Sequence, residues 1–455
     1  MPGERPPDPR DVREKPAPAP DTLAAPPGAG PATVAVAGAE FGWGSSGKLS
    51  AVLAALRARS ARPLRFVGLA SGLGRPLLAR HAVERWYDLP TGAPAGESAD
   101  AVAKIVEAEG IDAALVVLEG PTAMALEAAG VPTVFVDSLP FLWTEGDLPA
   151  LPLDVSVYCA QQCVELPKEC LDVLGSVRAL RWVEAVIGAP TQPPAHAPDG
   201  SERPRRSRPE PFRRVLVNLG GLRAPGLADW TRYPEVVVPA VLEALDVYGV
   251  REAHVAGNLP ADLAERFHAA GDAALRVTAG PLSHGAFLHR LAACDLLLTS
   301  PGLTTLLEAG SLAVPTVCLP PQNLSQIFNG RFHSRAVLAD VRVPWPSSVF
   351  AEDEVLAHRA QGEDAALRVI YGGIAAAAEA RNAPRSVNAV RDGVLEALRH
   401  ASAGAEWGGL AARVGTGGAA QVAAALLGLL DGEPPPGPAR STAPRPLQEG
   451  IDVHD

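Results

Sequence analysis

Aromatic side chains and methionine are scarce in this sequence. Phe, Trp and Tyr together make up 5% of the 455 residues, and there are only 2 methionines. Ala, Leu and Val carry most of the apolar content, which reaches 47%. This balance argues against an aromatic-rich β-sandwich and favours helices packed on buried strands, and it excludes wholesale disorder.

Cysteines and long apolar runs are equally sparse. The five cysteines are an odd number, and their spacing matches neither a disulfide framework nor a common zinc site. No run approaches the roughly 18 apolar residues that a membrane span needs, and no charged start followed by an apolar stretch opens the chain. We therefore expect a cytoplasmic protein without a membrane partner, with buried thiols at Cys294 and Cys318.

Positive charge is also in deficit. The formal net charge is −11 and the sequence pI is about 5.5, which argues against a nucleic-acid partner. The densest basic run, between Arg203 and Arg208, is interrupted by proline. We interpret it as a solvated linker rather than a site for a phosphate backbone.

Three proline-rich segments divide the chain. Residues 1–31 and 432–455 predict a disordered and a flexible tail, and residues 189–212 predict an interdomain linker. The folded parts are then 32–188 and 213–431. In both, short Val/Leu/Ile runs alternate with amphipathic helical segments, which is typical of parallel strands covered on both faces. The prediction is α/β: two Rossmann-like parallel-sheet domains facing each other across a cleft.

The loop after the first predicted strand, residues 38–50, is rich in glycine and opens a helix. It nearly matches a phosphate-binding P-loop, but Leu49 follows Lys48 where Ser or Thr would hold magnesium, and Ser50 comes one residue late. An NTPase loop, a metal-free anion or substrate loop and a structural turn are the three interpretations, and the second is preferred. Its candidate residues are Gly44, Ser45, Ser46, Gly47 and Lys48.

A second glycine loop mirrors the first one in the second block. Gly220 and Gly221 follow the first strand of that block, and Arg223 comes just after them. A Gly-Gly pair after a strand is weak evidence alone, since many turns need a residue with positive φ. The mirrored placement makes it a candidate binding loop.

The strongest motif runs from Leu296 to Gly310. An apolar strand ends in a Ser300-Pro-Gly302 turn where a helix begins, so free amides and the positive helix end face the cleft. Thr304 and Thr305 lie in the first turn, and Glu308 on the next turn can reach a ribose diol. A capped helix with a buried glutamate is the alternative. After the next strand come neutral groups suited to sugar hydroxyls, namely Gln322, Asn323 and Gln326.

The run Gly302–Glu308, followed by Gly310, Val314-Pro315 and the Gln322–Gln326 loop, resembles the donor-binding segment of GT-B glycosyltransferases, with the peptidoglycan N-acetylglucosaminyltransferase as the nearest pattern. The resemblance implies a UDP-sugar bound by the second domain. Glu308 would hold the ribose diol, Thr304 or Thr305 the diphosphate, and Gln322 or Asn323 the sugar. The first-loop histidine usual in such transferases is missing here.

More narrowly, three segments resemble cytosylglucuronate synthases of peptidyl-nucleoside antibiotic biosynthesis: residues 37–49, 118–121 and 135–143. The resemblance implies an inverting, metal-independent hexosyltransferase that moves glucuronate from UDP-glucuronate to N1 of cytosine or hydroxymethylcytosine. No cofactor is expected, since the UDP-sugar is a substrate. The alternatives are a UDP-sugar 2-epimerase of the same architecture, a non-catalytic nucleotide-sugar-binding protein and an NTPase.

Such a transfer needs a base to take the N1 proton, and strand ends of the first block offer Asp137, Glu40 and Glu119, in that order of preference. Each is also open to interpretation as a cap or turn residue. His284 is expected in the nucleotide pocket, and the cations available for the donor carboxylate are Lys48, Arg223 and Arg331. The alanine-rich segments near 375–400 and 417–430 either pack back on the domains or join two subunits of a homodimer.

Overall fold

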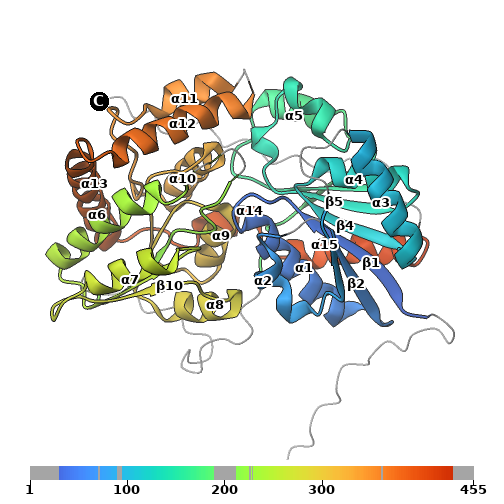
Figure 1. Ribbon diagram of the computed structural model, residues 1–455, viewed down its shortest axis with the longest axis horizontal. Helices are drawn as coiled ribbons and strands as arrows, with labels where there is room; N and C mark the ends of the chain where they lie inside the picture. The colour runs from blue at the N-terminus through green and yellow to red at the C-terminus, as the bar shows by residue number, and fades with distance from the viewer. Residues whose placement is uncertain are drawn as a thin grey trace, which may run out of the picture.

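The computed structural model describes residues 30–69, 72–89, 95–188, 212–224, 227, 229–359 and 362–433. The predicted tails and linker therefore lie outside the described residues except at their inner ends, and the predicted domain boundaries stay predictions. The described chain forms two parallel sheets, one in each half of the molecule (Figure 1).

The first sheet has seven strands in the order β3-β2-β1-β4-β5-β6-β7, all parallel. Its strands are β1 (Ala32–Gly38), β2 (Leu64–Leu69), β3 (Arg85–Tyr87), β4 (Ala113–Val117), β5 (Thr133–Asp137), β6 (Val157–Gln161) and β7 (Leu180–Val183). The helices and 3-10 turns of this half are α1 (Gly44–Arg59), α2 (Arg75–Leu78), η1 (Ala79–His81), α3 (Ala95–Glu109), α4 (Gly120–Ala128), η2 (Pro140–Leu142), η3 (Glu145–Ala150) and α5 (Lys168–Leu174).

The second sheet has five parallel strands in the order β10-β9-β8-β11-β12. Its strands are β8 (Arg214–Asn218), β9 (Glu252–Ala256), β10 (Arg276–Gly280), β11 (Leu296–Thr299) and β12 (Thr316–Cys318). The helices that follow β8 along the chain are α6 (Arg232–Tyr248), α7 (Ala261–Ala269), α8 (His284–Ala293), α9 (Leu303–Ser311), α10 (Leu324–Val337), α11 (Glu352–His358), α12 (Glu363–Ala378), α13 (Ala383–Ala403), α14 (Gly409–Val414) and α15 (Gly418–Leu430).

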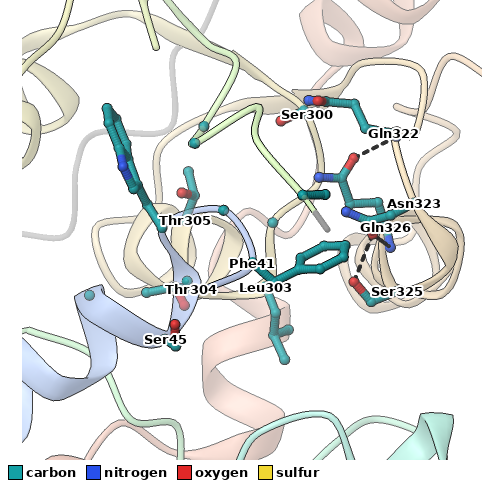
Figure 2. Close-up of a pocket in the computed structure, with 18 of the residues that line it drawn as sticks. Phe41, Ser45, Ser300, Leu303, Thr304, Thr305, Gln322, Asn323, Ser325 and Gln326 are labelled. Carbon is teal, nitrogen blue, oxygen red and sulfur yellow. Dashed lines mark hydrogen bonds between the residues drawn. The ribbon is translucent and has the colours of Figure 1, made fainter. Parts of the chain in front are cut away.

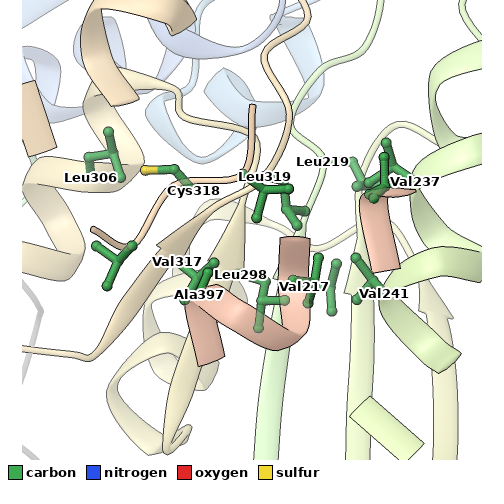
Figure 3. Close-up of a cluster of buried hydrophobic side chains, with 14 of the residues drawn as sticks. Val217, Leu219, Val237, Val241, Leu298, Leu306, Val317, Cys318, Leu319 and Ala397 are labelled. Carbon is green, nitrogen blue, oxygen red and sulfur yellow. The ribbon is translucent and has the colours of Figure 1, made fainter. Parts of the chain in front are cut away.

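The inner strands of both sheets are buried on their two faces, which explains their continuous apolar sequences. In the second half, side chains of β8, β11 and β12 pack against α6 and α13; Figure 3 shows Val217, Leu298 and Val317 beside Val241 and Ala397. Phe141 of the first half joins this core, and its ring lies edge-on to Phe332 of α10 with centroids 5.2 Å apart. An apolar contact therefore links the two halves directly.

The last helix returns to the first half of the molecule. Helix α15 packs against α1 and β4, and Val422, Ala423 and Leu426 are fully buried in the core of the first sheet (Figure 1). Its start is close-packed, since a Cβ on Gly418 would lie 2.0 Å from the Glu184 carbonyl oxygen. The alanine-rich helices thus pack on their own chain, α13 on α6 and α15 on α1.

One stretch of the described residues, Gly409–Leu430, is long and apolar enough to cross a membrane by length and composition, and 50% of its most apolar window is buried inside the protein. It comprises two helices, α14 and α15, interrupted at residues 415–417. Helix α15 packs against the first sheet, as the core helices of a folded domain do.

Strand order places the important loops. In each sheet the connection reverses direction between two neighbouring strands, β1 and β4 in the first and β8 and β11 in the second. Ligands of open parallel sheets bind at the carboxyl ends of such strand pairs. Both glycine loops and the Ser300–Gly302 turn follow these strands. The predicted fold class, α/β with two Rossmann-like parallel-sheet domains, is confirmed.

Candidate functional site

A cavity of about 340 Å³ lies between the two domains at the carboxyl ends of both sheets. Most of the predicted binding residues line it: Gly44, Ser45, Gly47, Lys48, Gly220, Gly221, Arg223, His284, Ser300, Gly302, Thr304, Thr305, Glu308, Gln322, Asn323 and Gln326. The loops that the sequence singles out in the two halves therefore meet at one place.

The two glycine loops touch each other across this cavity. The Gly42 amide donates to the Arg223 carbonyl at 3.0 Å. A Cβ on Gly221 would lie 2.6 Å from the Gly42 Cα, so only glycine allows the approach. Gly42 and Gly220 adopt φ values of +59° and +70°, which also favour glycine. The first glycine loop, which opens α1, is thus held directly against the second domain.

Helix α9 presents its N-terminus to the cavity. The N-cap residue, Gly302, offers no side-chain cap, and no acidic residue lies in the first turn. The first-turn residues Leu303, Thr304 and Thr305 line the cavity (Figure 2). Helix α1 also begins there without a side-chain cap or a first-turn acid. Two partially positive helix ends, one from each domain, therefore converge on the cavity, which suits an anionic ligand.

A buried polar cluster connects the domains beside these helix ends. The Lys48 ammonium donates to the Thr304 hydroxyl across the cleft, and only 2% of Lys48 is exposed. Burial lowers the pKa of Lys48 to about 8, while the Glu308 carboxylate acts in the opposite direction. On the other side, His284 Nε2 lies 2.7 Å from Glu308 Oε1, and both residues are buried. The cluster gives the cavity a cation next to a carboxylate.

The loop after β12 supplies the neutral polar groups. Gln322 Nε2 donates to the Leu219 carbonyl at 3.1 Å, which ties this loop to the second glycine loop. Asn323 Oδ1 accepts from the Ser325 hydroxyl at 2.9 Å and from the Gln326 amide at 3.1 Å, and so caps α10 (Figure 2). Gln322, Asn323 and Gln326 all line the cavity.

The structure does not bring the three predicted carboxylate bases to the cavity wall. Asp137 is fully buried, and its carboxylate accepts from the Leu139 amide at 2.9 Å, the Trp143 indole at 2.6 Å and the Tyr158 hydroxyl at 2.9 Å. Burial raises the pKa of Asp137 to about 6 against the effect of these donors. The prediction of Asp137 as the base does not fit this geometry, because three internal donors occupy its oxygens.

Glu40 and Glu119 lie near each other outside the residues that line the cavity. Glu40 is exposed and accepts from the Gly72 amide. Glu119 is half-buried, and burial and then the charge of Glu40 raise its pKa. Glu40 belongs to the first glycine loop and Glu119 is the N-cap residue of α4, and neither is among the residues that line the cavity.

Two further predicted residues also point elsewhere. Ser46 faces Gly74, whose added Cβ would lie 1.7 Å from its hydroxyl oxygen. Arg331 pairs with Glu352 at 2.9 Å and with Asp353 at 2.8 Å, so its expected role on the donor carboxylate does not fit. Arg223 does line the cavity, with its guanidinium 5.1 Å from the Trp230 ring centroid.

Several polar residues of the cavity are not among those predicted from the sequence. Asn218 and Ser138 each come at the end of a strand, so the preference of ligands for the carboxyl ends of parallel strands could have identified them. Asn329 is 1% exposed, donates to the Pro301 carbonyl at 3.0 Å and leaves its Oδ1 without a partner in the described residues. Glu363 and Tyr371 reach the cavity from α12, where no motif marks them. Burial and the charge of Asp147 raise the pKa of Glu363 to about 6.

The described residues hold no group of three or more His, Cys, Asp or Glu side chains placed to share a metal ion. All five cysteines are free and buried. Burial raises the pKa of Cys159, Cys163, Cys294 and Cys318 to about 12 in each case. Nucleophilic chemistry by these thiols is disfavoured, because the thiolate is the reactive form.

Comparison with known proteins finds no matching family model and no matching curated protein. Solved structures do resemble the chain. A UDP-glucosyltransferase from Polygonum tinctorium aligns over 83% of this chain and 99% of its own, with 14% identity and a TM-score of 0.47. The glycosyltransferase SnogD from Streptomyces nogalater aligns over 88% and 100%, with 16% identity and a TM-score of 0.47.

A UDP-GlcNAc 2-epimerase from Neisseria meningitidis, solved with UDP-GlcNAc, aligns over 81% of this chain and 97% of its own, with 13% identity and a TM-score of 0.44. Transferases and epimerases thus match to a similar degree. At this level of identity the resemblance concerns the fold alone.

Proposed function

We propose that this protein is an inverting, metal-independent hexosyltransferase that moves glucuronate from UDP-glucuronate to N1 of cytosine or hydroxymethylcytosine. The observation that carries the proposal is the convergence of the α1 and α9 N-termini with the Lys48 ammonium at one cavity between the domains. Such a site stabilises a diphosphate, the leaving group of a UDP-sugar.

The second domain offers the rest of a nucleotide-sugar site. Glu308 stands one turn into α9, where its carboxylate can accept from ribose hydroxyls. Leu282 and Phe287 line the cavity beside His284 and give apolar contact for a flat uracil ring. Gln322 and Asn323 suit sugar hydroxyls, and Arg223 and Lys48 are the cations near enough to serve a donor carboxylate.

The first domain supplies an apolar wall for the acceptor. Leu139, Leu142 and Trp143 line the cavity after β5, and an aromatic face suits a planar base. In the proposed reaction, N1 attacks the anomeric carbon of the α-linked donor from the face opposite the diphosphate, which gives a β-linked product. The narrower choice of glucuronate and cytosine rests on the sequence resemblance.

A UDP-sugar 2-epimerase would act on the donor alone, and a binding protein would not turn it over. The purified protein is incubated with UDP-glucuronate, with and without cytosine, in the presence of a chelator, and UDP and new cytosine-containing products are measured. Cytosine-dependent UDP release with chelator supports the proposal. Loss of donor without cytosine would support the epimerase instead, and release of inorganic phosphate from a nucleoside triphosphate only with magnesium would support an NTPase.

A further inference from the structure

The acceptor end of the cavity has a second wall, formed by α12 of the other domain. Glu363 and Tyr371 line the cavity from this helix, and Ser138 lines it from the loop after β5. The negative charge of Asp147 in η3 raises the pKa of Glu363, so the start of α12 lies close to the first domain. Residues of both domains therefore border the space in front of Trp143.

Arg359, just after α11, anchors this region to the first domain. Its guanidinium donates to the carbonyls of Leu142 and Trp143 at 3.1 and 3.2 Å, and pairs with Glu169 at 2.7 Å. The residue is 9% exposed, and its guanidinium carbon lies 5.5 Å from the Phe328 ring centroid. Glu363 follows Arg359 by four positions in the sequence, and Glu363 and Trp143 line the same cavity.

Three polar groups at this wall lack protein partners within the described residues. The Ser138 hydroxyl is buried without a hydrogen bond, and Ser138 is 1% exposed. The Tyr371 hydroxyl is likewise buried and unpartnered. No hydrogen bond or ion pair to a described residue engages the Glu363 carboxyl. Buried polar groups are normally paired, so these three are available to a ligand.

Glu363 differs from Asp137 in that its carboxyl group is open to a ligand in the cavity, as a general base requires. The Asp137 carboxylate does not line the cavity and accepts hydrogen bonds from three donors of the protein. Glu363 lines the cavity, and its carboxyl group has no hydrogen-bond partner among the described residues. Burial and the neighbouring acids Asp147 and Asp364 hold the pKa of Glu363 near 6, above its ordinary value. A carboxylate with a pKa closer to neutrality is a stronger base that is still ionised at pH 7.

We propose that Glu363 is the base of the transfer reaction and that Ser138 and Tyr371 bind the polar edge of the acceptor ring. This inference rests on the proposed function. The Glu363 carboxylate takes the proton from N1, and the freed N1 electron pair forms the bond to the anomeric carbon. The bond from that carbon to the diphosphate oxygen breaks, and UDP leaves with its electron pair. The two hydroxyls pair with the exocyclic oxygen and amine of the ring.

The test compares Glu363→Gln with Glu354→Gln, an exposed carboxylate on α11 that loses the same charge. With saturating UDP-glucuronate, Glu363→Gln is expected to lower kcat at least 100-fold, the scale of one general base. The KM for the donor should stay within about threefold, since Glu363 belongs to α12 and not to the α9 segment proposed to hold the donor (threefold being under 1 kcal/mol). The acid limb of the wild-type rate near pH 6 should disappear, and Glu354→Gln should match the wild type.

Ser138→Ala gives a second readout for the hydroxyl contacts. It is expected to raise the KM for the acceptor about tenfold, because a ring group then loses its buried partner, without changing the KM for the donor. Thermal unfolding of every variant checks that the fold is intact. A Glu363→Gln enzyme that keeps its kcat within threefold would overturn the inference while leaving the proposed function standing.

Absence of pyrimidine-dependent UDP release in the wild type would instead overturn the proposed function. Calorimetric titration of cytosine into the UDP-saturated protein then decides the site separately. Binding that weakens at least tenfold in both Ser138→Ala and Glu363→Gln supports a nucleobase site at this wall. Equal binding in these variants and the wild type, or no binding at all, would contradict it.

Discussion

The indole nitrogen of Trp143 donates to Asp137 Oδ2 at 2.6 Å, which fixes the ring that forms the acceptor wall. The same oxygen accepts from the Tyr158 hydroxyl at 2.9 Å, and the other carboxylate oxygen accepts from the Leu139 amide. Trp143 and Leu139 both line the cavity, whereas Asp137 does not. We therefore propose that Asp137 acts through these neighbours as a positioning residue.

Replacing Asp137 by Asn is expected to raise the KM for the acceptor about five- to tenfold, because the amide oxygen can keep the Trp143 and Tyr158 donors only if its NH₂ faces the Leu139 amide, so Leu139, which lines the cavity, has to move. The KM for UDP-glucuronate should not change. Tyr158→Phe is the matched control, since it removes one donor and leaves the indole bond in place. Steady-state kinetics with each substrate varied separately distinguish the two effects.

Asp137 also predicts a pH dependence of stability. Its folded-state pKa of about 6 lies above the ordinary value of 3.8. Between these values the folded protein holds a proton that the unfolded chain releases, so this group's contribution to stability falls as the pH rises from about 4 to 6. Urea unfolding of the wild type and Asp137→Asn is measured at pH 4.5 and 7. Raising the pH should lower the free energy of unfolding of the wild type, relative to that of the variant, by on the order of 1–3 kcal/mol. A pH-independent difference would contradict this.

The sequence predicted the loops of the site better than the direction of their side chains. Apolar runs such as those of β1 and β8 are readable because both faces of a parallel strand are buried. Glycines and a helix start then follow at the strand ends, where ligands bind. In contrast, Asp137 stands at a strand end like a site residue but turns inward, because Tyr158 and Trp143 supply donors that no local pattern reveals.

Other features depend on contacts between segments far apart in the chain. Strand β3 is short, and its Arg85 is exposed, so it carries no apolar run. Glu363 lies at the start of an alanine-rich helix without a motif, and its place at the cavity depends on how that helix packs in the molecule. Periodicity describes the helix but cannot give its place in the molecule.

Lys48 predicts an alkaline limit to donor capture. Its ammonium is charged below its folded-state pKa of about 8 and becomes neutral above it. The kcat/KM for UDP-glucuronate should therefore decline above about pH 8, since this ratio reports groups of the free enzyme. Lys48→Met keeps the length of the buried chain but removes the charge. It should raise the KM for the donor at least tenfold and abolish the decline.

Glu308 is expected to contribute to donor binding together with Lys48. Glu308→Ala should raise the KM for UDP-glucuronate at least tenfold, about 1.4 kcal/mol. Glu308→Ala also leaves the buried Lys48 and His284 side chains without their carboxylate neighbour. Glu308→Gln is therefore measured beside it, because glutamine keeps the side-chain shape. The double variant Lys48→Met/Glu308→Gln should lose less than the sum of the two single effects, since the side chains interact. Unchanged donor kinetics in all three variants would remove the α9 assignment.

Gly221 tests whether the contact between the two glycine loops is needed for transfer. A methyl group at this position would meet the Gly42 Cα at 2.6 Å, so the loops must separate or the domains open. Gly221→Ala is expected to lower kcat/KM at least tenfold, because a shift of about 1 Å in such a site is costly.

Gly372→Ala on the exposed side of α12 is the control, since its added methyl group meets nothing within 4 Å. It should preserve activity and stabilise the helix by about 0.5–1 kcal/mol. Small-angle scattering of both variants with UDP would show whether Gly221→Ala holds the domains apart; equal activity of the two variants would mean that the loop contact is dispensable.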